Sequence, residues 1–472
     1  MSPPKSYFFC GVGGSGMLPL ALIVKARGAE VMGSDRSLDQ GRTGDKFAFL
    51  RARGIPLFAQ DGSGLTRADQ ILVASAAVEK TIPDVQKAIA LGAPMMTRAA
   101  LLAELFNAAK TNIAVGGTSG KSTTTGMIGW ILAYAGRDPT IMNGAVMKNF
   151  MSADAPFASA LVGDGDLFVA EVDESDGSIA GYDPRIAVLN NISLDHKSME
   201  ELRQLFGDFV AKAEVAVLNI DNEETARIAN AAPAGKIVSY SLSDANADLR
   251  ADKLTHEAAG VSFDAIEKKT GARRRIAMKV PGAHNAANAL AAIGAVRALG
   301  VSLDEAGEAL AAFSGIRRRL EFVGTANGVT IIDDFAHNPD KIEATLTTLH
   351  AAPGRLLILF QAHGYGPLRL MKEQFIDTFA RDLAAEDVLA MPKPAYFGGT
   401  TDMSVTSEHI IEGVASAGRK ALYIEDRAQC AAHLLSIAKS GDRIVIMGAR
   451  DDTLSELAAS LVARLENEKA PA

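Results

Sequence analysis

A glycine-rich segment between two apolar stretches carries the strongest chemical signal in the sequence, and it reads Gly117-Thr118-Ser119-Gly120-Lys121-Ser122-Thr123. In a turn of this kind, backbone N–H groups wrap phosphates, a lysine ammonium reaches the β- and γ-phosphates, and the next hydroxyl binds Mg²⁺. Lys121 and Ser122 occupy those positions. The strict pattern has a glycine where Val115 stands, so this is a variant phosphate loop. We expect it to bind a nucleoside triphosphate; a glycine turn with a surface lysine is the alternative.

A second glycine-rich turn lies near the N-terminus and reads Gly11-Val12-Gly13-Gly14-Ser15-Gly16, with Asp35 further along. The pattern G-x-G-x-x-G followed by an acid predicts a diphosphate-containing nucleotide on a helix N-terminus, with the acid on the ribose. The loop does not identify the nucleotide, and an NAD-dependent oxidoreductase or a turn without a ligand would carry it too. A dehydrogenase does not need a triphosphate loop, however, whereas a ligase with a nucleotide-linked substrate needs both loops.

Acidic and imidazole side chains follow two later apolar stretches. The run at residues 171–176 follows the first of them, and we expect Glu171 to bind Mg²⁺, because hard divalent cations prefer oxygen ligands. The other carboxylates of this run, taken singly, are expected in a solvated loop. His196 follows the second stretch and is a candidate ligand of a second metal ion, although a histidine after a strand is more often structural.

Apolar segments of strand length alternate with helical stretches, which predicts parallel sheets covered by helices. We expect strands at residues 7–12, 29–32, 70–74, 112–115, 167–172, 186–190, 215–219, 329–333, 355–360, 387–391, 421–424 and 444–447. We expect helices at residues 98–108, 124–135 and 285–299, and a β-rich segment at 245–280. The pattern restarts twice, so we predict an α/β protein of three domains. The predicted domains are residues 1–109, 110–312 and 313–472.

The composition favours a globular protein over a disordered, secreted or membrane-spanning one. A chain of 472 residues suggests about three domains. The net charge of −8 argues against non-specific binding to nucleic acid. The sequence has two cysteines, Cys10 and Cys430, which argues against a disulfide framework. The apolar run at residues 17–24 is too short to span a bilayer. With no signal pattern at the N-terminus, we expect a cytoplasmic protein with no nucleic-acid partner and no membrane insertion.

Taken together, these motifs resemble the Mur ligase family. The first loop with Gly33-Ser34-Asp35 resembles the family's UDP-binding start, Thr97-Arg98-Ala99 resembles the end of its first domain, and residues 117–123 resemble its phosphate loop. Further matches follow in the family's order at residues 171–176, 191–196, 281–288, 317–321 and 333–339. Each match is short, but their order over three domains is specific.

The resemblance implies a Rossmann-like UDP-binding N-terminal domain, a P-loop ATPase-like central domain and a Rossmann-like C-terminal domain that binds the amine. It implies a ligase of peptidoglycan precursor synthesis that uses ATP and Mg²⁺. In this reaction the carboxylate of UDP-N-acetylmuramate becomes an acyl phosphate, which an amine such as L-alanine then captures. The catalytic residues implied are Lys121, His196 and Arg319. The ATP-binding residues implied are Gly117 to Thr123, Asn288, Arg319, Asp334 and His337. The UDP-binding residues implied are Gly11, Gly13, Gly14, Ser15, Gly16 and Asp35, and the metal ligands are Ser122, Glu171 and His196.

Some positions depart from the alanine-adding branch of the family: Ser119, Asn338 and Gly364. Gly364 stands where that branch usually has an arginine, which would pair with the amino-acid carboxylate, and Arg369 is a candidate substitute. Residues 143–150 and 189–191 instead resemble a sister branch, which attaches a recovered tripeptide to the same UDP-sugar. The amine therefore stays open between L-alanine and a peptide, and a non-catalytic nucleotide-binding paralogue is a further alternative. The sequence identifies neither the general base nor the oligomeric state, monomer or homodimer, and Lys212 is not assigned as a carbamylated metal ligand.

Overall fold

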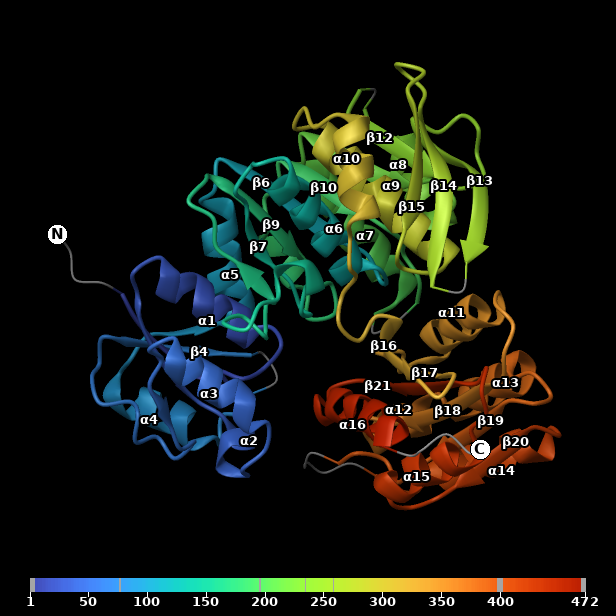
Figure 1. Cartoon of the computed structure of the whole chain (residues 1–472). Helices are drawn as coiled ribbons and strands as arrows, with labels where there is room; N and C mark the ends of the chain where they lie inside the picture. The colour runs from blue at the N-terminus through green and yellow to red at the C-terminus, as the bar shows by residue number, and fades with distance from the viewer. Residues whose placement is uncertain are drawn as a thin grey trace. The chain divides into compact units, whose positions relative to one another are not determined.

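Helices and strands alternate along the chain and build three sheets (Figure 1). The computed structural model describes residues 5–75, 78–194, 197–233, 235–257, 259–396 and 402–467. Two compact units make up the chain. One contains residues 1–255, 261–279 and 284–316, and the other contains residues 256–260, 280–283 and 317–472. No helix within the described ranges is long and apolar enough to cross a membrane.

The first sheet has five parallel strands in the order β3-β2-β1-β4-β5. Its strands are β1 (Ser6–Cys10), β2 (Glu30–Ser34), β3 (Leu57–Phe58), β4 (Gln70–Ala74) and β5 (Met95–Thr97). Its helices are α1 (Met17–Ala26), α2 (Arg36–Asp39), α3 (Gly44–Ala52), α4 (Pro83–Leu91) and α5 (Arg98–Asn107). The strand order reverses at β1, and ligands bind such sheets at the carboxyl ends of the strands beside the reversal. The first glycine loop begins there.

The second sheet has ten strands in the order β15-β14-β13-β12-β11-β10-β6-β9-β7-β8. Its strands are β6 (Thr111–Gly116), β7 (Thr140–Met142), β8 (Ala160–Leu161), β9 (Leu167–Glu171), β10 (Ile186–Leu189), β11 (Val215–Asn219), β12 (Ile237–Ser241), β13 (Leu249–Glu257), β14 (Gly260–Glu267) and β15 (Arg273–Met278). Its helices are α6 (Lys121–Tyr134), α7 (Met199–Lys212), α8 (Glu223–Ala231), α9 (Ala283–Arg297) and α10 (Leu303–Ala311), with 3-10 turns η1 (Lys148–Phe150) and η2 (Ser178–Gly181). Helix α10 packs against β15 and α6 (Figure 1), and the indole Nε1 of Trp130 donates to the carbonyl of Ala309 at 2.7 Å.

The third sheet has six strands in the order β16-β17-β21-β18-β19-β20, and β16 alone among its paired strands runs antiparallel. Its strands are β16 (Glu321–Ala326), β17 (Val329–Asp334), β18 (Leu356–Gln361), β19 (Val388–Met391), β20 (Lys420–Tyr423) and β21 (Arg443–Gly448). Its helices are α11 (Pro339–His350), α12 (Tyr365–Leu370), α13 (Lys372–Asp382), α14 (Ser407–Ser416), α15 (Arg427–Ile437) and α16 (Thr453–Asn467). The carboxyl ends of β17, β21 and β18 therefore meet at one edge.

One hydrophobic core extends across the first two sheets. Tyr7 of β1 and Phe106 of α5 belong to the same buried cluster as Phe168 of β9. Phe106 meets Phe168 and Tyr182 edge-on, with ring centroids 5.8 and 5.4 Å apart. Buried aromatic rings of this kind contribute large apolar areas and a specific packing geometry. The two sheets that carry the glycine loops are therefore held together by packed side chains.

The predicted elements and the observed ones agree within a few residues at most positions. Strand β4 has its predicted bounds, and the segment at 245–280 contributes β13, β14 and β15. Helix α6 begins at Lys121 rather than at residue 124, so the lysine and the two residues after it form its first turn. Strands β3, β5, β7, β8, β12 and β16 were not predicted. The α/β fold class is confirmed, whereas the predicted domain boundaries stay predictions.

Candidate active site

The phosphate loop joins β6 directly to α6, so its N–H groups lie at the N-terminus of a long helix. Gly117 and Gly120 adopt φ values of +126° and +83°, which side chains rarely tolerate. A Cβ atom on Gly120 would lie 2.6 Å from Oδ1 of Asn288 and 2.7 Å from Nδ2 of Asn190. The glycines are therefore required both by the backbone conformation and by the close approach of neighbouring amides. The first N–H groups of α6 have no intrahelical acceptor and attract anions.

Residues after β10 brace this loop from the side. The backbone N–H groups of Thr118 and Ser119 donate to the carbonyl and to Oδ1 of Asn191, at 3.0 and 2.9 Å. The carboxamide of Asn190 donates to Oγ1 of Thr124 at 3.0 Å. That same hydroxyl donates to Oδ1 of Asn288 at 3.2 Å. The structure thus brings Asn288 of α9 beside the phosphate loop, while its predicted contact with a nucleotide base stays a prediction.

Lys121 forms an ion pair inside this site. Its ammonium lies 2.8 Å from Oε2 of Glu174 and donates to the carbonyl of Gly117 at 2.7 Å. The side chains are 19% and 6% exposed. Burial acts to lower the pKa of Lys121, but the charges of Glu174, Asp173 and Glu171 outweigh it and raise that pKa above its usual value. The ammonium is therefore held charged at the place where phosphates would lie. The expectation that Glu174 sits in a solvated loop was wrong, because the cation of Lys121 makes its burial tolerable.

Ser122 and Glu171 meet next to this ion pair. The hydroxyl of Ser122 donates to Oε2 of Glu171 at 2.7 Å, and the carboxamide of Asn143 donates to the carbonyl of Ser122 at 2.9 Å. Gly144 leaves the space that the Glu171 carboxylate fills, since a Cβ atom there would collide with Oε1. A hydroxyl and a carboxylate oxygen side by side suit Mg²⁺, which completes its shell with water and phosphate oxygens. His196 lies outside the described residues, and within them no group of three acidic, histidine or cysteine side chains forms a metal cluster.

The first glycine loop is held by Asp35 at the end of β2. Its Oδ2 accepts from the N–H of Gly13 at 2.8 Å, and its Oδ1 accepts from the N–H of Ser37 at 2.8 Å. Gly11 adopts φ +85°, and a Cβ on Gly13 would come within 3.0 Å of Asp35 and of Phe47. Asp35 thus shapes the loop, and its predicted contact with a ribose stays a prediction. Gly14 and Ser15 are exposed at the tip of the loop and Gly16 precedes α1, where a diphosphate would bind.

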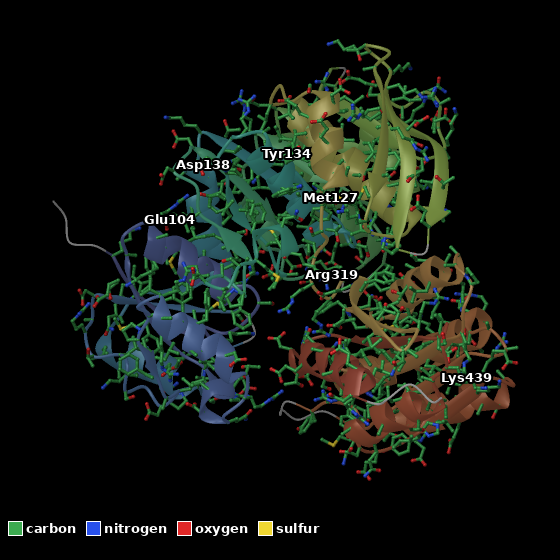
Figure 2. All side chains as sticks on the ribbon, viewed as in Figure 1. Glu104, Met127, Tyr134, Asp138, Arg319 and Lys439 are labelled. Atoms are coloured by element: carbon green, nitrogen blue, oxygen red, sulfur yellow. The ribbon has the colours of Figure 1, made fainter. Side chains whose placement is uncertain are left out.

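The second unit brings Arg319, Asp334 and His337 to the carboxyl end of β17. The guanidinium of Arg319, labelled in Figure 2, lies over the ring of Phe335 at 4.3 Å. The carboxylate of Asp334 accepts from the N–H of Leu320 at 2.9 Å and from the hydroxyl of Thr345 at 2.6 Å. Asp334 therefore fixes the backbone after Arg319. Its predicted contact with the nucleotide stays a prediction.

His337 is a partly buried, neutral imidazole. Its Nδ1 lies 2.8 Å from the carbonyl of Phe335, so Nδ1–H donates and Nε2 is left as an acceptor. Burial lowers its pKa to about 3, helped by the positive charges of Lys341 and Arg319. Its ring meets the ring of His363 edge-on at 5.2 Å. His337 and His363 thus lie together at the ends of β17 and β18.

Comparison with known proteins assigns the family. Three family models match in order: "Mur ligase family, catalytic domain" over residues 6–110, "Mur ligase middle domain" over 115–296, and "Mur ligase, glutamate ligase domain" over 318–450. A UDP-N-acetylmuramate–L-alanine ligase of Streptomyces coelicolor is 36% identical over 457 residues, which are 94% of this chain and 95% of that protein. The chain belongs to the Mur ligase family.

Solved structures of Mur ligases share its fold. A UDP-N-acetylmuramate–alanine ligase from Thermotoga maritima matches with a TM-score of 0.80 and 24% identity, covering 98% of this chain and all of that one. A murein peptide ligase from Psychrobacter arcticus matches with a TM-score of 0.73 and 24% identity, covering 99% and 100%. The predicted three-domain α/β fold is confirmed, and this Mur ligase is an ATP-dependent ligase rather than an oxidoreductase.

One position that departs from the alanine-adding pattern, Asn338, has an identifiable role in this Mur ligase. Asn338 caps α11 by accepting from the N–H of Lys341 at 3.0 Å. Arg369 is 57% exposed, and its Nη1 lies 3.9 Å from Oδ2 of Asp402. Lys212 donates to the carbonyls of Ala180 and Tyr182, at 2.6 and 3.1 Å, and lies 3.0 Å from Oδ1 of Asp183.

Sequence reasoning missed two residues of this Mur ligase that the geometry makes important. Glu174 was passed over because an acidic run usually lies in solvent, and only its position beside Lys121 reveals its role. Arg318 was quoted only as part of a motif. Its side chain is buried and its backbone adopts φ +59°. A left-handed non-glycine residue costs about 1 kcal/mol or more and marks a backbone held by its surroundings. No sequence signal separates Arg318 from its two arginine neighbours.

Proposed function

We propose that this chain joins L-alanine to UDP-N-acetylmuramate, with ATP and Mg²⁺, in peptidoglycan precursor synthesis. The observation that carries the proposal is the phosphate loop, where Lys121 and Ser122 contact Glu174 and Glu171 at 2.8 and 2.7 Å. The 36% identity to a relative named UDP-N-acetylmuramate–L-alanine ligase over almost the whole chain supports the choice of substrates. The UDP part would bind at Gly11 to Gly16.

The reaction proceeds in two displacements. The muramate carboxylate attacks the γ-phosphorus of ATP, the bond to the β-phosphate oxygen breaks, and ADP leaves. The amine then attacks the acyl carbon, phosphate leaves, the nitrogen loses a proton and the amide remains. Lys121 and Arg319 would stabilise the charge on the transferred phosphoryl group. When bound at Ser122 and Glu171, Mg²⁺ would neutralise phosphate charge and align the reacting oxygens.

The Lys121 ammonium must exchange partners during this cycle. In the structure it lies against Glu174, and on binding ATP it would turn to the phosphates. For the ammonium one anion replaces another, whereas Glu174 loses its cation. Glu174 would then face the phosphates without its partner unless a cation accompanies them. This arrangement favours binding of ATP together with Mg²⁺ over binding of free ATP.

The tripeptide-adding reaction is the second candidate, because the expected arginine is absent at Gly364 and the side chain of Arg369 points to Asp402 instead. A solved murein peptide ligase shares the fold with a TM-score of 0.73, against 0.80 for the alanine ligase. A non-catalytic paralogue is disfavoured, because Lys121, Glu171 and Arg319 are retained. We also propose a cytoplasmic protein, as a monomer or homodimer.

The test is a coupled phosphate-release assay with ATP, Mg²⁺ and UDP-N-acetylmuramate against a panel of amines. We expect L-alanine to stimulate ADP formation most, with the amide product identified by mass spectrometry. Stimulation by the tripeptide and not by L-alanine would instead support the tripeptide-adding reaction. ADP formation that no amine stimulates would refute the ligase proposal.

A further inference from the structure

Arg319 lies between two residues with left-handed backbones. Arg318 adopts φ +59° and Leu320 adopts φ +47°. Side chains crowd the backbone in this region, so single non-glycine residues occupy it only where neighbouring contacts hold them there. Two such residues on either side of one arginine indicate a loop whose shape is imposed from outside. The contacts of Arg318 and Leu320 identify what imposes it.

The Arg318 side chain is anchored entirely within its own unit. Its Nη2 donates to the carbonyl of Gly448 at 2.6 Å, its Nη1 to the carbonyl of Asp451 at 3.1 Å, and its Nε to Oδ1 of Asp333 at 3.3 Å. The residue is 7% exposed. All three guanidinium nitrogens therefore have protein partners at the ends of β17 and β21. A guanidinium fork satisfied in this way is a structural anchor, with no face left for a substrate.

The backbone of Arg318 in turn holds Arg319. The carbonyl of Arg318 accepts from the N–H of Phe335 at 2.9 Å and from Nη1 of Arg319 at 3.1 Å. The guanidinium of Arg319 lies 4.3 Å above the Phe335 ring, a distance typical of a cation–π contact. On the other side, Asp334 fixes the N–H of Leu320. Arg319 thus has its backbone clamped at both ends and its side chain set on an aromatic ring.

We propose that Arg318 is a positioning residue for phosphoryl transfer: its buried guanidinium fixes the left-handed turn that holds Arg319, the residue to which the proposed function assigns the γ-phosphate, in one orientation within its own unit. The inference deepens the proposed function and rests on it. A preorganised cation needs no rearrangement when charge develops, which is why fixing its direction affects rate more than binding. Arg318 itself touches neither nucleotide nor UDP-sugar in this proposal.

The experiment compares full-length variants in the phosphate-release assay. We expect Arg319→Ala to lower kcat on the order of tenfold to hundredfold, the usual effect of losing one charge-assisted contact. Arg318→Met and Arg318→Lys should lower kcat by at least fivefold, with Arg318→Met approaching Arg319→Ala, while KM for UDP-N-acetylmuramate stays within twofold. The double variant Arg318→Met/Arg319→Ala should be no slower than Arg319→Ala, because both changes remove the same contact.

Arg443 provides a matched control. It is also 7% exposed and donates to three backbone carbonyls, those of Leu349, Ala352 and Gly354, but it lies at the opposite end of β21. Arg443→Met should therefore lower thermal stability as Arg318→Met does, yet leave kcat of the folded enzyme unchanged.

Three outcomes would overturn one claim or the other. Wild-type kcat in folded Arg318→Lys would overturn the positioning role, because the shorter lysine cannot reach all three acceptors. If the fold losses in kcat of the two single variants multiplied in the double variant, the two residues would act independently and the positioning role would also be overturned. Wild-type kcat in Arg319→Ala would instead overturn the role assigned to Arg319 in the proposed function.

Discussion

The buried ion pair in the phosphate loop makes a quantitative prediction. Replacing Lys121 by methionine keeps the apolar stem of the side chain but leaves the Glu174 carboxylate, 6% exposed, without its cation. Removing one partner of a buried pair typically costs about 3–5 kcal/mol, because the remaining charge is desolvated and unpaired. Lys121 is 19% exposed, so water can reach its position and we expect the lower end, about 3 kcal/mol.

The assay measures the Tm of the full chain by calorimetry in the absence of nucleotide. For a unit of this size, about 3 kcal/mol corresponds to a fall in Tm of roughly 5 °C or more. The double variant Lys121→Met/Glu174→Gln should recover at least half of that fall, because no buried charge is then left unpaired. Both variants should be inactive.

A surface pair supplies the control. Lys5 and Glu104 also lie 2.8 Å apart, but their side chains are 58% and 51% exposed. Exposed pairs contribute about 0–1 kcal/mol, so Lys5→Met should barely change Tm. If Lys121→Met were as stable as Lys5→Met, or if the double variant were no more stable than the single one, Glu174 would not depend on Lys121 and the reasoning would be refuted.

Three further predictions test other parts of the site. Gly144→Ala should weaken Mg²⁺ binding, because the added Cβ displaces the Glu171 carboxylate. The Mg²⁺ concentration for half-maximal activity should rise several-fold, and an unchanged concentration would contradict Glu171 as a ligand. Gly120→Ala should weaken ATP binding by at least tenfold in a titration, because its Cβ would meet Asn288 and its φ of +83° is strained; wild-type affinity would mean that the loop adapts. The pKa of His337 is about 3 when folded and near 6.5 when unfolded, so the unfolded chain takes up a proton first and stability should fall as pH drops from about 6.5 towards 3. In urea unfolding midpoints His337→Gln should make that decline less steep, and an equally steep decline would contradict a neutral imidazole in the folded protein.

Local chemistry made much of the fold predictable. Strands such as β4 are apolar runs bounded by turn residues, and both glycine loops follow such strands, so their positions could be read from spacing alone. Most strands that escaped prediction, β7, β8 and β16 among them, are short or lie at sheet edges, where pairing rather than side-chain pattern creates the strand. Strand β12, with five residues inside the second sheet, is the exception.

The site shows the same division between local and long-range information. Lys121, Ser122 and Glu171 could be predicted, because each stands at a fixed place relative to a strand end. The burial of Glu174 could not be predicted, because it depends on an ammonium 53 positions away in sequence. Arg318 and Arg319 are neighbours of identical type, and only the carbonyls of Gly448 and Asp451, more than 120 positions later, distinguish an anchor from a candidate ligand contact.

The contact between α6 and α10 has a consequence for synthesis on the ribosome. Helix α6, which carries Lys121, is covered on one side by α10, and the indole of Trp130 donates to the carbonyl of Ala309 between them. The layer over α6 therefore stays incomplete until residues beyond 309 have emerged. At translation rates of about 5–20 residues per second, roughly 200 further residues take on the order of ten seconds or more. During that interval the face of α6 that α10 later covers stays uncovered.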